Sequence, residues 1–144
     1  MKYLLLLLFQ TIIVSAQAQN KNDSTAIIQL LKMDYATMGN FDIQAHLANC
    51  TKDYLLIENG EVWDLKKETE WYRANAHKLI TRTDSFTIRT IKVFNNLAYA
   101  VYHLISNITE NNVLKIKTWN ESVIFRKEQG MWKIALIHST PLPQ

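Results

Sequence analysis

The stretch that decides the fold is residues 119–140, "WNESVIFRKEQGMWKIALIHST", which predicts two antiparallel strands joined by a tight Gln129-Gly130 turn. Apolar and polar residues alternate along it, as they do in strands that bury one face. One face carries Trp119, Val123 and Phe125, yet it also carries Glu121. Because an isolated buried carboxylate is costly, we expect Glu121 to have a partner across the hairpin.

The length of the loop decides which residue that partner is. A two-residue loop at Gln129-Gly130 places Glu121 opposite His138, whereas a three-residue loop places it opposite Ser139. We favour the two-residue loop because it puts three further apolar residues on the aromatic face, namely Trp132, Ile134 and Leu136. Directly opposite residues have Cβ atoms about 4.5–5.5 Å apart, so a carboxylate and an imidazole can share a hydrogen bond there.

The predicted Glu121–His138 pair has two interpretations. In the functional one, Glu121 orients His138 as an acid, a base or a hydrogen-bond donor, and both are candidate catalytic residues. In the other, they form a structural polar pair that closes the sheet against the helices. Both interpretations stay open, because ionisable pairs occur at functional sites and also in structural networks.

The rest of the chain predicts helices first and long strands last. An amphipathic helix is expected from an N-cap at Asp23 or Ser24 to Gly39, with apolar residues at helical spacing. Asp42 and Asp64 are predicted N-caps of a second and a third helix, the third with Leu79 on its buried face. Between these two caps, "DYLLIENGEVW" predicts a hairpin with an Asn-Gly turn.

From residue 82 to residue 139 the chain is rich in Thr and in β-branched and aromatic residues. Breaks at residues 95–96, 110–112 and 129–130 divide this region into four long antiparallel strands. Helices followed by such strands predict an α+β architecture, in which a curved antiparallel sheet wraps around the N-terminal helices.

A curled sheet over a helix layer usually encloses a cavity, where a ligand would bind. The aromatic residues expected to line it are Tyr35, Trp63, Tyr72 and Trp119. Tyr102 and His103 are also candidates, although strand alternation allows only one of the two to face inward. By contrast, we expect four polar residues to be solvated or at the edge of the core, namely Asp34, His46, Glu58 and His77.

The N-terminus predicts export. "MKYLLLLLFQTIIVSAQAQN" has one Lys, an apolar run and an Ala16-Gln17-Ala18 site, as in secretory signal peptides. Its uninterrupted run is shorter than the roughly 20 apolar residues of a membrane span. We therefore expect residues 1–18 to be a cleaved signal peptide and residues 19–144 to be a single domain of a periplasmic or secreted protein without stable membrane insertion.

Composition narrows the choice of partners and cofactors. The net charge is only +3, and no basic cluster is present, so we expect no binding to nucleic acid. Cys50 is the only cysteine, and the four histidines show no metal-ligand spacing, so we expect neither a metal nor another cofactor. Nucleophile-elbow, phosphate-loop and dinucleotide motifs do not occur in the sequence either.

Two stretches carry a resemblance to a known family. "YATMGNFDIQAHLANCTKDYLLIENGEVWD" and the closing hairpin resemble the nuclear transport factor 2-like superfamily, and within it the small SnoaL-like exported domains. The resemblance implies a cone-shaped, cystatin-like α+β fold with a pocket inside the cone. Ketosteroid isomerase, in the same superfamily, uses a Tyr from the first helix and two acidic residues. Tyr35 and Glu58 lie roughly where two of those groups are expected, but Glu58 departs from the usual Asp.

The same resemblance implies a homodimer formed through the outer face of the sheet. In this sequence the residues expected on that face are Thr118, Asn120, Ser122, Ile124, Ala135 and Ile137.

Two functions therefore stay open. The first is an exported domain that binds a small organic molecule in an apolar pocket. Whether this domain also catalyses an acid/base reaction of the isomerase, dehydratase or cyclase type stays open. The second is a non-catalytic dimerisation or protein-binding module of the cell envelope.

Overall fold

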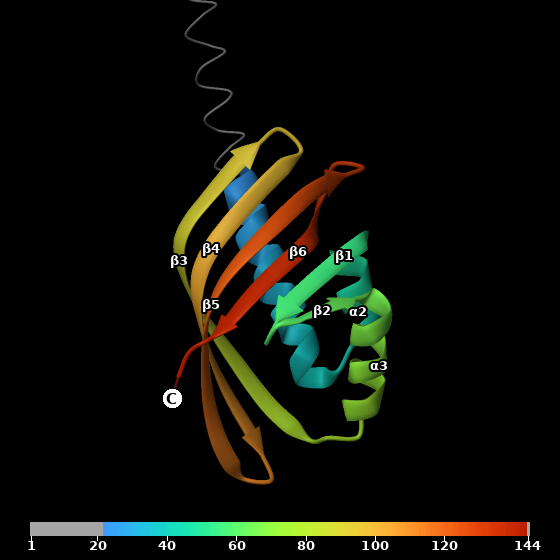
Figure 1. Ribbon diagram of the computed structural model, residues 1–144, viewed down its shortest axis with the longest axis vertical. Coiled ribbons are helices and arrows are strands. Elements are labelled where there is room, and N and C mark those ends of the chain that lie inside the picture. Colours follow the sequence, from blue (N-terminus) through green and yellow to red (C-terminus); the bar gives the residue numbers. More distant parts are fainter. Residues whose placement is uncertain (1–21, 144) are drawn as a thin grey trace, which may run out of the picture.

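A curled six-stranded sheet forms the main layer of the structure and wraps around the helices (Figure 1). The computed structural model describes residues 22–143. In chain order the strands are β1 (Cys50–Glu58), β2 (Glu61–Asp64), β3 (Ile80–Phe94), β4 (Leu97–Glu110), β5 (Val113–Glu128) and β6 (Met131–Pro141). Their order in the sheet is β2-β1-β6-β5-β4-β3, and β1 pairs with β6 in parallel while all other neighbours are antiparallel. The predicted α+β class with a curved sheet is confirmed.

The helices form as predicted, with small differences at their ends. In the described part of the chain the first helix covers residues 22–40, so Asp23 and Ser24, expected at its N-cap, lie within it. α2 (Ile43–Asn49) begins after Asp42, whose carboxylate accepts a hydrogen bond from the Ala45 amide, and α3 (Leu65–Asn75) begins after Asp64 in the same way. Leu79, expected on the buried face of α3, lies beyond the end of that helix and is 91% exposed.

Tight turns join the strands where the sequence places breaks. Asn59-Gly60 and Gln129-Gly130 both have positive φ at both positions, which is the geometry of the two-residue turns that suit twisted hairpins. Asn95, Asn111 and Asn112 also adopt positive φ, as asparagine does more readily than most residues. All four predicted turns are therefore present.

The last hairpin starts in the predicted register and then shifts by one residue. Phe125 pairs with Ile134, but Ile124 pairs with Leu136, so a β-bulge on β6 leaves Ala135 without a direct partner. Beyond the bulge Glu121 pairs with Ser139, and the predicted Glu121–His138 pairing is wrong. The physical reason is that one extra residue reverses the alternation of every later side chain on that strand.

The same bulge exchanges the inner and outer residues at the end of β6. Ile137, expected on the outer face, is 5% exposed and packs in the core, whereas His138 is exposed on the opposite face. Bulges bend strands and increase their twist, which fits a sheet that must curl around helices.

Apolar residues from the first helix meet the inner face of the sheet in one core. The buried members include Ile27, Leu31, Tyr35, Tyr102, Val123, Phe125 and Ile134. Within residues 22–143, no helix is long and apolar enough to cross a membrane. The predicted signal peptide falls outside the described residues.

Candidate functional site

A cavity of about 430 Å³ lies between the helices and the inner face of the sheet. Its walls are rich in aromatic residues, namely Tyr35, Phe41, Tyr54, Trp63, Trp71, Tyr72 and Trp119. They also carry acidic side chains, namely Asp34, Glu58, Glu68, Glu110 and Glu121. An apolar, aromatic cavity with a few converging polar groups has the usual composition of a small-molecule site.

Glu121 is the most deeply buried acidic residue contributed by the sheet, at 4% exposure. Its carboxylate accepts hydrogen bonds from the hydroxyl of Tyr35, on the first helix, and from the hydroxyl of Ser139, 2.7 Å away on β6. Tyr102, directly opposite Glu121 on β4, donates to the Tyr35 oxygen at 3.4 Å. The side chains that donate hydrogen bonds to Glu121 are therefore Tyr35 on the first helix and Ser139 on β6, and Tyr102 on β4 supports Tyr35. His138 is not among these partners.

Burial shifts the proton equilibria of this cluster. Burial is the largest effect on the pKa of Glu121 and raises it, the nearby charge of Glu58 also raises it, and the hydrogen bonds that the carboxyl group accepts only partly offset this rise. Burial also raises the pKa of Tyr35 and of Tyr102 well above 10. Both tyrosines thus stay protonated donors at neutral pH, next to a carboxyl group that takes up a proton more readily than an exposed one.

Most of the predicted pocket residues lie where they were expected. Tyr35, Trp63, Tyr72 and Trp119 line the cavity. Tyr102 faces inward with 1% exposure. His103 points to the outer face, where its ring nitrogen is 3.2 Å from the Asn120 side-chain oxygen. The catalytic role proposed for His138 depends on a pairing that the register excludes, since its side chain is exposed on the outer face.

A second buried polar group lies at the helical side of the cavity. His46, on α2, places Nδ1 3.0 Å from Asp34 Oδ1 and Nε2 2.8 Å from Glu68 Oε2. Tyr72 stacks on its ring with centroids 5.2 Å apart. Asp34 and His46 are 2% and 3% exposed, so the prediction that they are solvated or at the core edge is wrong.

The surroundings of His46 favour its imidazolium form. Desolvation by itself would lower its pKa, but hydrogen bonds to Asp34, Cys50 and Glu68 outweigh that effect and raise it well above the ordinary value. Carboxylates only accept hydrogen bonds, so an imidazole placed between two of them is best satisfied when both ring nitrogens carry protons. The group is thus a cation shared by two anions.

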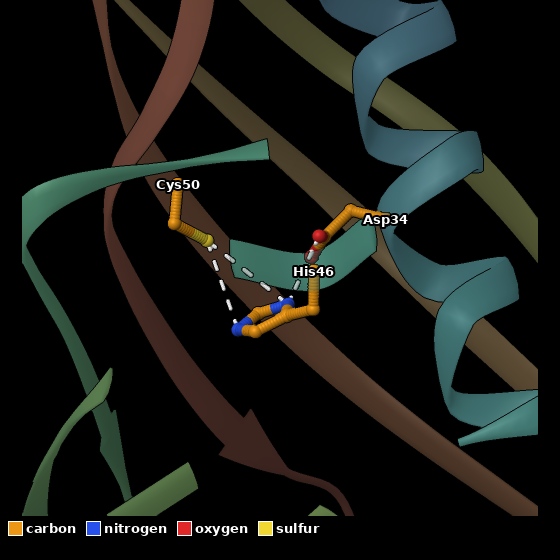
Figure 2. A group of neighbouring side chains, drawn as sticks. All are labelled: Asp34, His46 and Cys50. Carbon is orange, nitrogen blue, oxygen red and sulfur yellow. Dashed lines mark hydrogen bonds and ion pairs between the residues drawn. The ribbon is translucent and has the colours of Figure 1, made fainter. Parts of the chain in front are cut away.

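Cys50 completes this group, with its sulfur 3.7 Å from His46 Nε2 and 4.0 Å from Nδ1 (Figure 2). The potential ligand atoms of Asp34, His46 and Cys50 lie within 4.8 Å of one another. Burial raises the pKa of Cys50 to about 11, so the sulfur is a thiol at neutral pH, whereas a metal binds the thiolate. Both ring nitrogens of His46 are also engaged by carboxylates, so these side chains are arranged as a hydrogen-bonded network.

A third polar group lies on β3 and β4. Arg82 Nε donates to both carboxylate oxygens of Asp84, at 3.0 and 2.9 Å, and its Nη2 donates to the Ser106 hydroxyl at 3.0 Å. Its guanidinium carbon lies 5.7 Å from the centre of the Tyr35 ring. The positive charge of Arg82 is therefore compensated within the wall of the cavity.

Sequence reasoning missed several residues of the site. Asp34 follows Leu30 and Leu31 at helical spacing, so its place on the apolar stripe of the first helix was an available signal. Glu58 is not a freely solvated charge, because it accepts a hydrogen bond of 3.0 Å from Trp119 Nε1. Ser139 entered the sequence analysis only as the partner of Glu121 for a three-residue loop, which was not the favoured register, and no sequence signal pointed to Glu68.

Comparisons with known proteins agree on the fold. No family model matches the sequence, and no curated protein does. An NTF-2 like protein of unknown function from Shewanella oneidensis is 22% identical with a TM-score of 0.65, and the match covers 81% of this chain and 98% of that one. A ketosteroid isomerase-like protein from Erwinia carotovora is 17% identical with a TM-score of 0.66, covering 83% and 96% of the two chains.

The association domain of C. elegans CaMKII is 14% identical with a TM-score of 0.70, and the match covers 85% of this chain and 98% of that one. Identities this low carry information on the fold and leave the activity open.

Proposed function

Since the chain has the nuclear transport factor 2-like fold, we propose that its cavity binds a small, largely apolar organic molecule. The single observation that supports this most is the Tyr35–Glu121 contact in the cavity wall. A buried carboxyl group with a raised pKa next to tyrosine hydroxyls is costly to maintain, and such groups are enriched at functional sites.

The chemistry we propose is proton transfer or hydrogen-bond donation at Glu121 and Tyr35. The hydroxyl of Tyr35 stays protonated and donates to Glu121, and burial raises the pKa of Glu121 above its ordinary value, so this carboxyl group holds a proton more readily than an exposed one. Together they can stabilise negative charge that develops on an oxygen of the bound molecule. Such a site suits isomerase, dehydratase or cyclase reactions, in which a proton moves next to a polarised oxygen.

Native mass spectrometry of the protein purified from its own compartment tests this proposal. We expect a co-purifying small molecule that is released on denaturation and is depleted in Glu121→Gln. The matched control is Glu70→Gln, which removes the charge of an exposed residue of α3 that does not line the cavity. An empty wild-type protein, or equal retention by Glu121→Gln, would contradict the proposal.

We also propose that the protein is exported, which the signal-peptide pattern of residues 1–18 supports. Cell fractionation followed by N-terminal sequencing checks this. A mature protein that begins after Ala18 in the periplasm or the medium is expected. Recovery of the full-length chain in the cytosol would contradict it.

The second candidate function is a non-catalytic assembly module. It is favoured by the likeness to the CaMKII association domain and by apolar residues on the outer face of the sheet. In that case the Glu121 cluster only stabilises the fold. A stable monomer at micromolar concentration would count against this candidate, whereas an empty cavity in an obligate oligomer would favour it.

A further inference from the structure

Two of the acidic side chains that line the cavity, Glu58 and Glu121, have no cationic side chain bonded to them in the described part of the chain. On the helical side, Asp34 and Glu68 share the single cation His46. On the sheet side, Glu58 and Glu121 also line the cavity, and the side chains that donate hydrogen bonds to them are neutral hydroxyl and indole groups. A charge withdrawn from water is normally paired, so the partly buried carboxylate of Glu58 favours a cation that residues 22–143 do not supply.

The other basic residues of the cavity do not supply that cation. Arg82 is held by Asp84 through two hydrogen bonds. Lys78 lies at the mouth, 3.8 Å from Glu110, with its side chain 41% exposed. Lys117 is exposed as well. Charges exposed at the mouth are screened by solvent and act weakly on the interior.

Aromatic side chains stand next to these carboxylates. Trp119 donates its indole N–H to Glu58, which fixes the carboxylate beside the ring. Trp63 also lines the cavity. Indole faces attract ammonium ions, and aromatic walls combined with a carboxylate are a recurrent arrangement for organic cations.

We propose that the cavity binds a protonated organic amine, with Glu58 as the counter-charge and the indoles of Trp63 and Trp119 as the walls around it. This inference rests on the proposed small-molecule function and adds the charge class of the ligand. The cation compensates the charge of Glu58 next to Glu121, and it remains in contact with aromatic faces after it leaves water. The apolar part of the ligand then occupies the remainder of the cavity.

Isothermal titration of the purified protein with three probes of similar size tests the inference. The probes are 2-phenylethylamine, the neutral 2-phenylethanol and the anionic 3-phenylpropanoate. At neutral pH we expect the amine to bind about tenfold or more tightly than the alcohol, and the carboxylate to bind most weakly.

The variant Glu58→Gln keeps an acceptor for the Trp119 indole but removes the charge. It should lose most of the preference for the amine and leave the affinity for the alcohol almost unchanged. Glu70→Gln, the exposed control, should keep the preference.

If the alcohol or the carboxylate binds as tightly as the amine, the amine inference is overturned and the small-molecule function still stands. Absence of binding by all three probes overturns the inference, and an empty cavity in native mass spectrometry separately overturns the function.

Discussion

The hydroxyl of Tyr35 donates a hydrogen bond to the carboxylate of Glu121, although 86 positions separate the two residues in the chain. This contact joins the first helix to β5 in the wall of the cavity. It places a proton donor and a carboxyl group with a raised pKa where a ligand would bind.

Tyr35→Phe should destabilise the protein while leaving its fold intact. The variant removes one donor from a buried carboxyl group, which costs about 1–3 kcal/mol of the free energy of unfolding. Urea denaturation monitored by tryptophan fluorescence measures this. In a double-mutant cycle with Glu121→Gln, the two effects should not be additive, because the residues share one hydrogen bond. Strict additivity would show that the contact contributes nothing to stability.

Glu121 should make the stability of the protein depend on pH. Its pKa is raised in the folded state above the ordinary 4.5, so its contribution is fully present below about pH 4.5. That contribution is lost as the pH rises through the folded-state pKa, because the unfolded chain releases the proton first. Urea denaturation at a series of pH values should show that wild type loses stability relative to Glu121→Gln as the pH rises. A constant difference between the two proteins would refute the raised pKa.

Loss of His46 should be among the most damaging substitutions in the chain. His46→Ala leaves Asp34 and Glu68 as buried, unpaired carboxylates, and removal of one partner of a buried ion pair typically costs about 3–5 kcal/mol. His77→Ala is the matched control, since His77 is exposed and should change stability by less than about 0.5 kcal/mol. Thermal and urea denaturation measure both. Equal, small effects would mean that the His46 group is not an ion pair.

The charge of His46 can be observed directly. Its folded-state pKa is raised above 6.5, so its stabilising contribution is fully present below that pH and declines only as the pH rises further. The NMR resonances of the His46 ring should therefore not titrate between about pH 5 and 8. A titration midpoint within that range would contradict the proposed imidazolium.

The outer face of the sheet offers a surface for self-association. Tyr99, Ile124, Leu136 and Leu55 are register partners on four adjacent strands, and they form an apolar row on this face. We propose a homodimer through it and expect Ile124→Lys to give a monomer in analytical ultracentrifugation. Val113→Lys, at an exposed apolar position on the β4–β5 hairpin, is the control and should keep the wild-type mass. A wild-type monomer would refute the dimer.

Local sequence signals predicted the elements well. The caps Asp42 and Asp64, the Asn59-Gly60 and Gln129-Gly130 turns and the four long strands are all present, because each depends on residues close together in the chain. The inward position of Glu121 followed from alternation counted from the turn. Its partner did not, because Glu121 pairs with the part of β6 that lies beyond the bulge at Ala135.

The sequence by itself determined the order of helices and strands, the turns and the apolar faces, since capping, turn geometry and periodicity act over a few residues. Only the tertiary structure decided which polar side chains meet. The bulge moved Ser139 inward and His138 outward, and the packing of the helices brought Asp34, His46 and Glu68 together. Such contacts depend on how the sheet curls and where the helices lie against it, and these are properties of the whole chain.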